Sequence, residues 1–168
     1  MQEIKKRYPN IQWRLVLAGD EWKWNETTWK VLWPKSLSHA ENEDSILALV
    51  TVMKQTILLT GDASEKVEEA VVKDNPHLQF SILKAGHHGS RTSSGEALLK
   101  LVQPRLAFIS CGKHNHYGHP SPETLARLKA TGAIIFRTDQ DGQIRLRFTR
   151  EKLEVTTRLT KRKKELKQ

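Results

Sequence analysis

Apolar and polar positions change their rhythm once along the chain, near residue 45. Beyond it, short apolar runs typical of buried strands alternate with segments whose apolar residues recur every three or four positions, as in amphipathic helices. Strands are expected at residues 45–52, 55–60, 80–85, 106–111 and 134–138, and helices at 64–73, 95–102 and 122–131. This alternation predicts an α/β sandwich with a mixed sheet.

Antiparallel strand pairs are expected on both sides of this central part. Residues 53–54 form a tight turn between the first two of these strands, and Asp141-Gly142 is expected to turn the strand at 134–138 back into a second arm at 143–148. Upstream, strands are expected at 13–17 and 28–33, with a turn between them at 18–21.

All five tryptophans precede residue 45: Trp13, Trp22, Trp24, Trp29 and Trp33. Their spacing favours packing between sheet layers over a ligand cage.

The composition fits one soluble globular domain, with 168 residues of which 38% are hydrophobic and 28% charged. A mostly disordered or fibrous chain is excluded. No apolar run reaches the roughly 18 residues that span a bilayer, and residues 1–10 are too polar for a signal peptide. The single cysteine, Cys111, excludes an intrachain disulfide and a Cys-rich zinc site, and we interpret it as a small hydrophobic residue.

Most of the net charge of +9 lies near the C-terminus, where residues 145–168 hold ten Lys and Arg against three Glu. The run Lys161, Arg162, Lys163 and Lys164 suits contact with nucleic-acid phosphates or an anionic membrane surface. A solvated, frayed tail is the alternative interpretation. We therefore divide the chain into a domain at 1–150 and a basic C-terminal tail at 151–168.

Three of the expected strands end in residues that bind metals. Asp62 follows the strand at 55–60, His87 and His88 follow the strand at 80–85, and a segment with three histidines, including His119, follows the strand at 106–111. Ligands of open α/β sheets bind beyond the carboxyl ends of strands, and imidazole with carboxylate suits Zn, Mn or Fe. Taken singly, the Gly-Asp pair would be a turn and residues 114–119 a polar loop; together they predict a metal site.

Two further histidines have simpler interpretations. His77 follows a proline in a connecting turn, and His39 lies in a polar stretch. Both are expected at the surface.

Four motifs resemble the C-terminal metallo-β-lactamase-like domain of the ComEC family of DNA-internalisation competence proteins. They are residues 58–62 (Leu-Leu-Thr-Gly-Asp), 83–90 (Leu-Lys-Ala-Gly-His-His-Gly-Ser), 117–120 (Tyr-Gly-His-Pro) and 137–142 (Arg-Thr-Asp-Gln-Asp-Gly). The resemblance covers roughly residues 33–148. It implies an αββα sandwich, a soluble domain attached to a bacterial plasma-membrane protein that forms a DNA channel, and a metal-dependent nuclease that degrades the strand that does not enter.

The resemblance also implies roles for residues of the site. Asp62 matches an aspartate that bridges two divalent ions, Mn or Zn. His87 is then a ligand, and His88 a second ligand or a phosphate contact; alternatively His119 is the ligand and the His87/His88 pair faces the phosphate. Asp62, His88 and His119 would carry catalysis, with a histidine free of metal protonating the leaving 3′-oxygen. The implied phosphate or DNA contacts are Lys84, Ser90, Asn115, Tyr117 and the run Lys161, Arg162, Lys163 and Lys164.

One departure from the family pattern limits these expectations. Metallo-β-lactamase folds carry a His-x-His-x-Asp-His motif after an early strand, whereas the only histidine before Asp62 is His39. We therefore expect a truncated piece that lacks the N-terminal half of its domain and holds at most one ion by itself. Such a piece would expose apolar surface, which favours homodimerisation.

Three functions compete at this stage. The first is hydrolysis of DNA phosphodiesters, and the second is a non-catalytic DNA-binding or inactive fragment of the same domain. The third is a different hydrolase of the superfamily, such as a lactonase-like or small phosphodiester enzyme. Cleavage of DNA with Mn²⁺, salt-sensitive binding without cleavage, and turnover of small esters alone distinguish the three.

Overall fold

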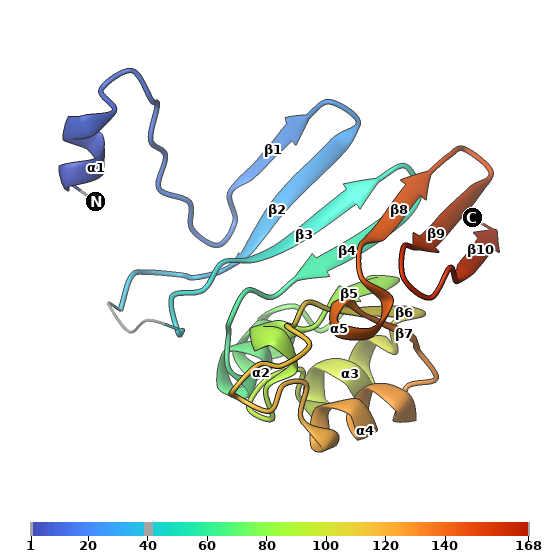
Figure 1. Cartoon of the computed structure of the whole chain (residues 1–168). Helices are drawn as coiled ribbons and strands as arrows, with labels where there is room; N and C mark the ends of the chain where they lie inside the picture. Colours follow the sequence, from blue (N-terminus) through green and yellow to red (C-terminus); the bar gives the residue numbers. More distant parts are fainter. Residues whose placement is uncertain (1, 39–41, 168) are drawn as a thin grey trace.

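The computed structural model describes residues 2–38 and 42–167, which form two sheets, with the helices that connect the parallel strands on one side of them (Figure 1). His39 lies outside the described residues. The elements in chain order are α1 (Gln2–Arg7), β1 (Glu21–Trp24), β2 (Thr27–Trp33), β3 (Leu47–Val52), β4 (Gln55–Leu59), α2 (Glu65–Asp74), β5 (Ile82–Lys84), the 3₁₀ helix η1 (Gly86–Gly89), α3 (Glu96–Val102), β6 (Leu106–Ile109), α4 (Pro122–Ala130), β7 (Ile134–Arg137), α5 (Thr138–Asp141), β8 (Ile144–Phe148), β9 (Lys152–Thr157) and β10 (Lys163–Lys167).

The larger sheet has seven strands in the order β1 to β7, so every strand lies beside its neighbour in sequence. Strands β1 to β4 pair antiparallel, and β4 to β7 pair parallel. Helices α2, α3 and α4 connect the parallel strands and cover one face of the sheet (Figure 1). The mixed sheet and the alternation of strands and helices that the sequence predicts are thereby confirmed.

The main core lies between the helices and the large sheet. Val67 and Val71 of α2, Leu98 of α3 and Leu128 of α4 are at most 2% exposed. They pack in one cluster with side chains of β4 and β5 such as Leu58. The apolar face of each helix therefore fixes how the carboxyl ends of these strands are arranged.

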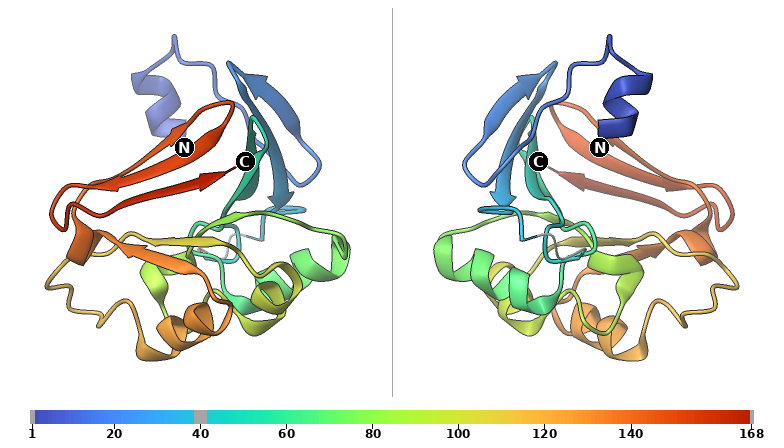
Figure 2. Two further views of the ribbon diagram at one scale, coloured as in Figure 1. Left: turned by 90° about the vertical axis from the view of Figure 1, so that its right-hand side faces the viewer. Right: turned by 90° about the vertical axis from the view of Figure 1, so that its left-hand side faces the viewer.

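The second sheet, with strand order β10-β9-β8, packs on the opposite face of the large sheet (Figure 2). Leu153 and Val155 of β9 meet Ile82, Leu106 and Phe136 in a second apolar cluster. The described residues thus build three layers of the expected αββα sandwich: helices, large sheet and small sheet.

The expected hairpin over residues 134–148 is wrong, because β8 pairs with β9 and not with β7. After β7 the chain forms α5 and leaves the large sheet at Gly142, whose φ is 68°. The carboxylate of Asp141 is 2% exposed and accepts hydrogen bonds from the backbone N–H of Arg137 and the hydroxyl of Thr160. This buried anchor redirects the chain into the second sheet.

The interpretation of residues 151–168 as a solvated tail is corrected, since β9 and β10 form two of the three strands of the small sheet. Apolar side chains alternate along β9, and ion pairs join Lys163 to Glu154 and Glu165. A boundary at residue 150 would therefore cut through a sheet. Because the segment is so rich in charged residues, the alternation of buried and partly exposed side chains along β9 is hard to recognise in the sequence.

The N-terminal segment also differs from its prediction. Residues 12–17 form no strand, and β1 follows them as the edge strand of the large sheet. Trp22 and Trp29 lie opposite each other on β1 and β2, with stacked rings whose centroids are 5.9 Å apart. Trp24 is 66% exposed and Trp13 is 43% exposed, so these two do not pack between layers. Trp33 packs against the main core as expected.

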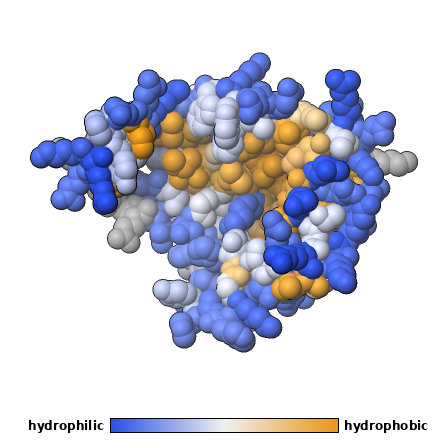
Figure 3. All heavy atoms as spheres, turned by 45° about the horizontal axis from the view of Figure 1, so that its top comes forward, coloured by the Kyte–Doolittle hydropathy of each residue, from blue (hydrophilic) through white to orange (hydrophobic). Residues whose placement is uncertain are grey.

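Apolar side chains gather in a band on the face seen in Figure 3. Ile57, Leu146 and Phe148 are only partly buried against the second cluster.

No helix within the described ranges is long and apolar enough to span a bilayer.

Candidate functional site

The carboxyl ends of β4, β5 and β6 lie side by side, because the three strands pair parallel in direct register. Asp62 follows β4, His87 and His88 lie in η1 directly after β5, and residues 112–120 follow β6. The sequence expectation that these three strand ends meet at one edge of the sheet is confirmed.

Both histidines of η1 have left-handed backbone conformations. The φ and ψ angles are 42° and 49° for His87 and 57° and 18° for His88. Such angles are unfavourable for residues with a Cβ and persist only where the surroundings enforce them. The backbone N–H of His87 donates to the Gly61 carbonyl over 3.0 Å, which ties η1 to the loop that carries Asp62.

His88 has a defined tautomer. Its Nδ1 lies 2.7 Å from the carbonyl oxygen of Ser110. A carbonyl only accepts hydrogen bonds, so Nδ1 carries the proton and donates. The Nε2 atom of the exposed His88 side chain therefore keeps its lone pair for a metal ion or a proton.

His119 approaches His87 from the loop after β6. The two ring centroids are 5.8 Å apart, and the ring of Tyr117 stacks on His119 at 5.9 Å. Partial burial lowers the pKa of His119, and the neighbouring His87 and His88 lower it further. His119 therefore favours the neutral form, which is the form that binds metals.

Asn115 holds the loop that carries His119. Its Oδ1 accepts from the backbone N–H of His119 over 2.9 Å, and its Nδ2 donates to the His119 and Gly112 carbonyls. The side chain expected to contact phosphate is thus already engaged in shaping the loop.

A cavity of about 210 Å³ opens beside these residues. Its lining residues are His88, Cys111, Gly112, Asn115, Tyr117 and His119. The volume is smaller than the roughly 300 Å³ at which pockets for drug-sized ligands begin. A small anionic group such as a phosphate fits a space of this size.

Lys84 is a half-buried cation near this cavity. Its ammonium donates to the Ala85 carbonyl over 2.8 Å. Burial lowers the pKa of Lys84, while the nearby Asp62 carboxylate and the Cys111 side chain oppose the shift. The lysine therefore lies within the electrostatic reach of both strand ends, as its expected phosphate role requires.

The other expected phosphate contacts lie in different environments. Ser90 is 7% exposed and its hydroxyl pairs with that of Thr92, whereas Tyr117 is 83% exposed. Lys161, in the connection between β9 and β10, and Lys164, on β10, are exposed. Arg162 instead pairs with the buried Asp141, and Lys163 pairs with two glutamates. The basic run therefore does not act as one uniform contact.

Cys111 lies closer to the site than its interpretation as a small hydrophobic residue suggested. It lines the cavity, and its thiol donates to the Asp139 carboxylate over 3.2 Å. Burial raises the pKa of Cys111 to about 11, and Asp139 raises it as well. The side chain is therefore a thiol rather than a reactive thiolate. His77 is exposed, as expected.

The donor set suits a divalent ion in its chemistry. Two imidazoles on one zinc ion, each with a Zn–N bond of about 2.0–2.1 Å, would have ring centroids about 5 Å apart. The separation of His87 and His119 approaches this value at 5.8 Å. Within the described ranges, however, no three His, Cys, Asp or Glu side chains are arranged to hold an ion. The residues thus fit part of a metal site.

Glu68 is a residue near the site that no sequence pattern singled out. It lies on α2 and is 1% exposed. Burial raises its pKa to about 7, although hydrogen bonds from the backbone N–H groups of Gly95 and Ser94 oppose the shift. One glutamate among several on a helix carries no signal of burial.

Comparison with known proteins gives matches over most of the chain. The model of the family described as "Metallo-beta-lactamase superfamily" matches residues 31–114. Recombination protein 2 of Haemophilus influenzae is 32% identical over 94% of this chain, ComE operon protein 3 of Bacillus subtilis is 35% identical over 79%, and Competence protein ComA of Neisseria gonorrhoeae is 34% identical over 76%. The chain covers 22%, 17% and 19% of these three proteins, respectively.

A solved structure from Parabacteroides distasonis, of a protein assigned as a metal-dependent hydrolase, has a similar fold. The TM-score is 0.51 with 12% sequence identity, over 83% of this chain and 62% of the other. At this identity the likeness concerns the fold alone.

Proposed function

Because the chain belongs to the metallo-beta-lactamase superfamily and to the ComEC family of competence proteins, we propose that it is a metal-dependent hydrolase of DNA phosphodiesters that acts in DNA uptake. DNA and the membrane channel of the parent protein are the partners that this function requires. The relatives named for competence and recombination support this assignment.

The approach of the His87, His88 and His119 rings, together with the bond that joins the His87 N–H to Gly61 next to Asp62, is the observation that carries the proposal. Neutral imidazoles and a carboxylate form a donor set for Mn²⁺ or Zn²⁺. His87 and His119 are the proposed ligands, with Asp62 as the ligand from the neighbouring strand. When bound, the metal would supply Lewis acidity and an activated water.

Proton transfer falls to His88 in this proposal. The proton of its Nδ1 stays on that nitrogen and is donated to the Ser110 carbonyl, which leaves Nε2 as the atom that holds or releases a proton. Once protonated at Nε2, His88 can donate to the leaving 3′-oxygen of the DNA. Because His88 lines the cavity, a phosphate seated there lies within its reach.

Phosphate binding is assigned to Lys84, and contact with the adjoining nucleoside to Tyr117. The half-buried ammonium of Lys84 offsets negative charge at the reacting phosphate, and the exposed Tyr117 ring offers a surface for a base or sugar. Lys161, between β9 and β10, and Lys164, on β10, do not line the cavity and would add salt-dependent affinity for the DNA backbone.

A second candidate is DNA binding without cleavage. It is favoured by the finding that the described residues form no complete group of three metal-ligating side chains. In this case the chain would hold one ion weakly and contribute affinity only.

The experiment combines metal analysis with a cleavage assay. Mn and Zn per chain are measured by elemental analysis for the wild type, Asp62→Ala and the control Asp74→Ala, which removes a surface carboxylate paired with Lys35. Duplex and single-stranded DNA are then incubated with each protein and Mn²⁺. Stoichiometric metal and cleavage, both lost only in Asp62→Ala, are expected. Salt-sensitive DNA binding without cleavage favours the second candidate, and turnover of small esters without action on DNA contradicts both.

A further inference from the structure

The buried carboxylate of Glu68, on α2, is hydrogen-bonded to the loop between η1 and α3. The Glu68 side chain is 1% exposed, and its two oxygens accept hydrogen bonds from the backbone N–H groups of Ser94, at 2.9 Å, and Gly95, at 2.6 Å. Burial of a carboxylate is unfavourable unless hydrogen bonds compensate it, and the two N–H groups supply that compensation here. Because each oxygen of Glu68 binds a different backbone N–H, the side chain fixes the loop conformation at two consecutive residues.

The same loop is hydrogen-bonded to Gly86, the residue that precedes His87 and His88. The Ser93 hydroxyl donates to the Gly86 carbonyl over 2.8 Å, and the Gly86 N–H donates to the Ser94 hydroxyl over 3.3 Å. Ser93 and Ser94 are both 0% exposed. A Cβ on Gly86 would lie 3.1 Å from Ser93 Cβ and from Thr60 Oγ1, so the contact is close on both sides.

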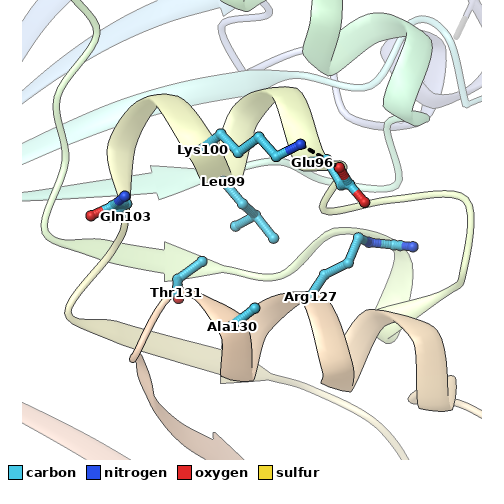
Figure 4. A pocket seen from close by; sticks show the side chains of 7 residues that line it. All are labelled: Glu96, Leu99, Lys100, Gln103, Arg127, Ala130 and Thr131. Atoms are coloured by element: carbon cyan, nitrogen blue, oxygen red, sulfur yellow. Dashed lines mark hydrogen bonds and ion pairs between the residues drawn. The ribbon is translucent and has the colours of Figure 1, made fainter.

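Arg127 of α4 holds the same loop from the other side. Its guanidinium donates to the carbonyls of Arg91, Ser93 and Ser94 over 2.8–3.1 Å, and it pairs with Glu65 of α2 at 3.2 Å. Figure 4 shows the side chain extending from α4 toward the start of α3, where Glu96 lies. Carbonyl and N–H groups of one loop are thus fixed by two charged side chains from two helices.

The residue held by these contacts, Gly86, directly precedes two residues whose backbone angles are unfavourable without support from their surroundings. His87 and His88 follow Gly86 directly, and both have positive φ. Consecutive left-handed residues with side chains persist only where their surroundings enforce the conformation. The hydrogen bonds of Ser93 and Ser94 with Gly86, together with the bond from the His87 N–H to Gly61, provide that enforcement.

We propose that Glu68 and Arg127 are positioning residues, which act through Ser93, Ser94 and Gly86 to hold the imidazoles of His87 and His88 in the orientation needed for metal binding. The inference rests on the proposed function in assigning metal binding to these histidines. It adds two residues that touch neither metal nor DNA.

The first test compares Glu68→Gln with Glu69→Gln. The amide introduced by Glu68→Gln would offer one acceptor oxygen in place of two and would turn an NH₂ group toward an N–H donor. Glu69 is exposed on the same helix and undergoes the same chemical change, so it is the matched control. Arg127→Lys, which keeps the charge but not the three-way donation, is compared with Lys129→Gln on the exposed side of α4.

Two readouts separate positioning from general stability. Hydrogen exchange of the His87 amide, which donates to Gly61, and of the Ser90 amide, which donates to the His87 carbonyl, reports the conformation of the histidine loop. Zn²⁺ affinity, measured at a temperature where circular dichroism shows every variant folded, reports the imidazoles. In Glu68→Gln and Arg127→Lys, the protection of the two amides against exchange and the affinity for Zn²⁺ are each expected to fall by at least about tenfold. This is in line with the roughly 10–100-fold effect of groups that orient metal ligands. The controls should match the wild type.

The contrary result is a variant with a lowered melting temperature but wild-type exchange of the loop and wild-type Zn²⁺ affinity, which would make Glu68 a purely structural residue. If Glu68→Gln does not fold, Ser93→Ala removes the bond to Gly86 and decides the question by the same readouts. If the wild type binds no Zn²⁺, the proposed function fails, whereas loop exchange still decides whether Glu68 and Arg127 hold the histidines.

Discussion

The guanidinium of Arg162 lies 3.2 Å from the carboxylate of Asp141, which is only 2% exposed. The same guanidinium covers the ring of Phe136 at 4.3 Å from its centroid. Arg162 precedes β10, Asp141 ends α5, and Phe136 belongs to β7. This contact therefore fastens the small sheet to the large one at the point where the chain passes between them.

Removal of Arg162 should destabilise the fold, because the buried Asp141 carboxylate then loses the cation that pairs with it while keeping the bonds from Thr160 and Arg137. For Arg162→Ala we expect a loss of about 2 kcal/mol in the free energy of unfolding, below the full range for buried pairs because the arginine is partly exposed. Chemical denaturation measures this loss. Arg158→Ala, an exposed arginine nearby, should stay within about 0.5 kcal/mol of the wild type; an equal effect of both substitutions contradicts the prediction.

Metal affinity should depend on His119 and not on its neighbour His116. His119 lies 5.8 Å from the His87 ring, whereas His116 is exposed in the same loop. His119→Ala should weaken Zn²⁺ binding by at least about tenfold, since one ligand is lost. His116→Ala should bind as the wild type does. Titration calorimetry distinguishes these outcomes, and equal affinities for both variants would exclude His119 as a ligand.

Glu68 should give the protein a characteristic pH dependence. Its pKa is raised from 4.5 to about 7 in the folded state, so the native protein binds more protons than the unfolded chain between these values. The stabilisation is complete below pH 4.5 and is lost as the pH rises toward 7. We expect it to fall by on the order of 3 kcal/mol across this window in the wild type. Denaturation of Glu68→Gln should lack this component of the slope, and parallel profiles of the two proteins would refute the assignment.

Gly89 should resist substitution for two reasons that a control can separate. It has a φ of 84°, and an added Cβ would lie 2.5 Å from Pro120 Cβ, in the loop that carries His119. Gly118 has a φ of 69° but nothing within 4 Å of an added Cβ. Gly118→Ala should cost about 1 kcal/mol from backbone strain alone, and Gly89→Ala should cost about 2 kcal/mol more from the clash. Thermal unfolding of both variants tests this order.

The proposed DNA binding should draw on Lys161, in the connection between β9 and β10, and on Lys164 of β10, which are both exposed. Replacing both by Gln should reduce the slope of log affinity against log salt by about 2 for duplex DNA, since each phosphate contact contributes about 0.9. Lys66→Gln with Lys73→Gln on α2 changes the net charge equally and should leave the slope unchanged. Fluorescence anisotropy over a salt series provides the measurement, and equal slopes for the two double variants would show that only net charge matters.

The central elements were predictable because their signals are local. The apolar runs that became β3 to β7, and the periodic segments that became α2, α3 and α4, lie within a few residues of their expected positions. That the loops carrying Asp62, His87 and His119 follow neighbouring strand ends also came from the sequence, because parallel neighbours bring their carboxyl ends to one edge of a sheet.

The path after β7 was not predictable in this way. Asp141-Gly142 is a typical hairpin signal, and only the hydrogen bonds of Asp141 to Thr160 and Arg162, which lie about twenty positions later in the chain, turn it into a crossover to a second sheet. The same distant contacts changed Arg162 from an expected DNA contact into a structural residue. Residues 151–168 looked like a tail because ion pairs across strands leave no local pattern.

The order of strands and helices, the family and the sheet edge that carries the candidate site could all be read from the amino-acid sequence, because each depends on neighbours in the chain or on short motifs. Tertiary structure alone decided that Glu68 is buried against Ser94 and Gly95, that Arg127 reaches the loop of His87 and His88, and that Lys163 and Lys164 differ in their contacts. Burial, pKa and the partner of a charged side chain are set by groups that folding brings together from distant positions, and no local pattern encodes them.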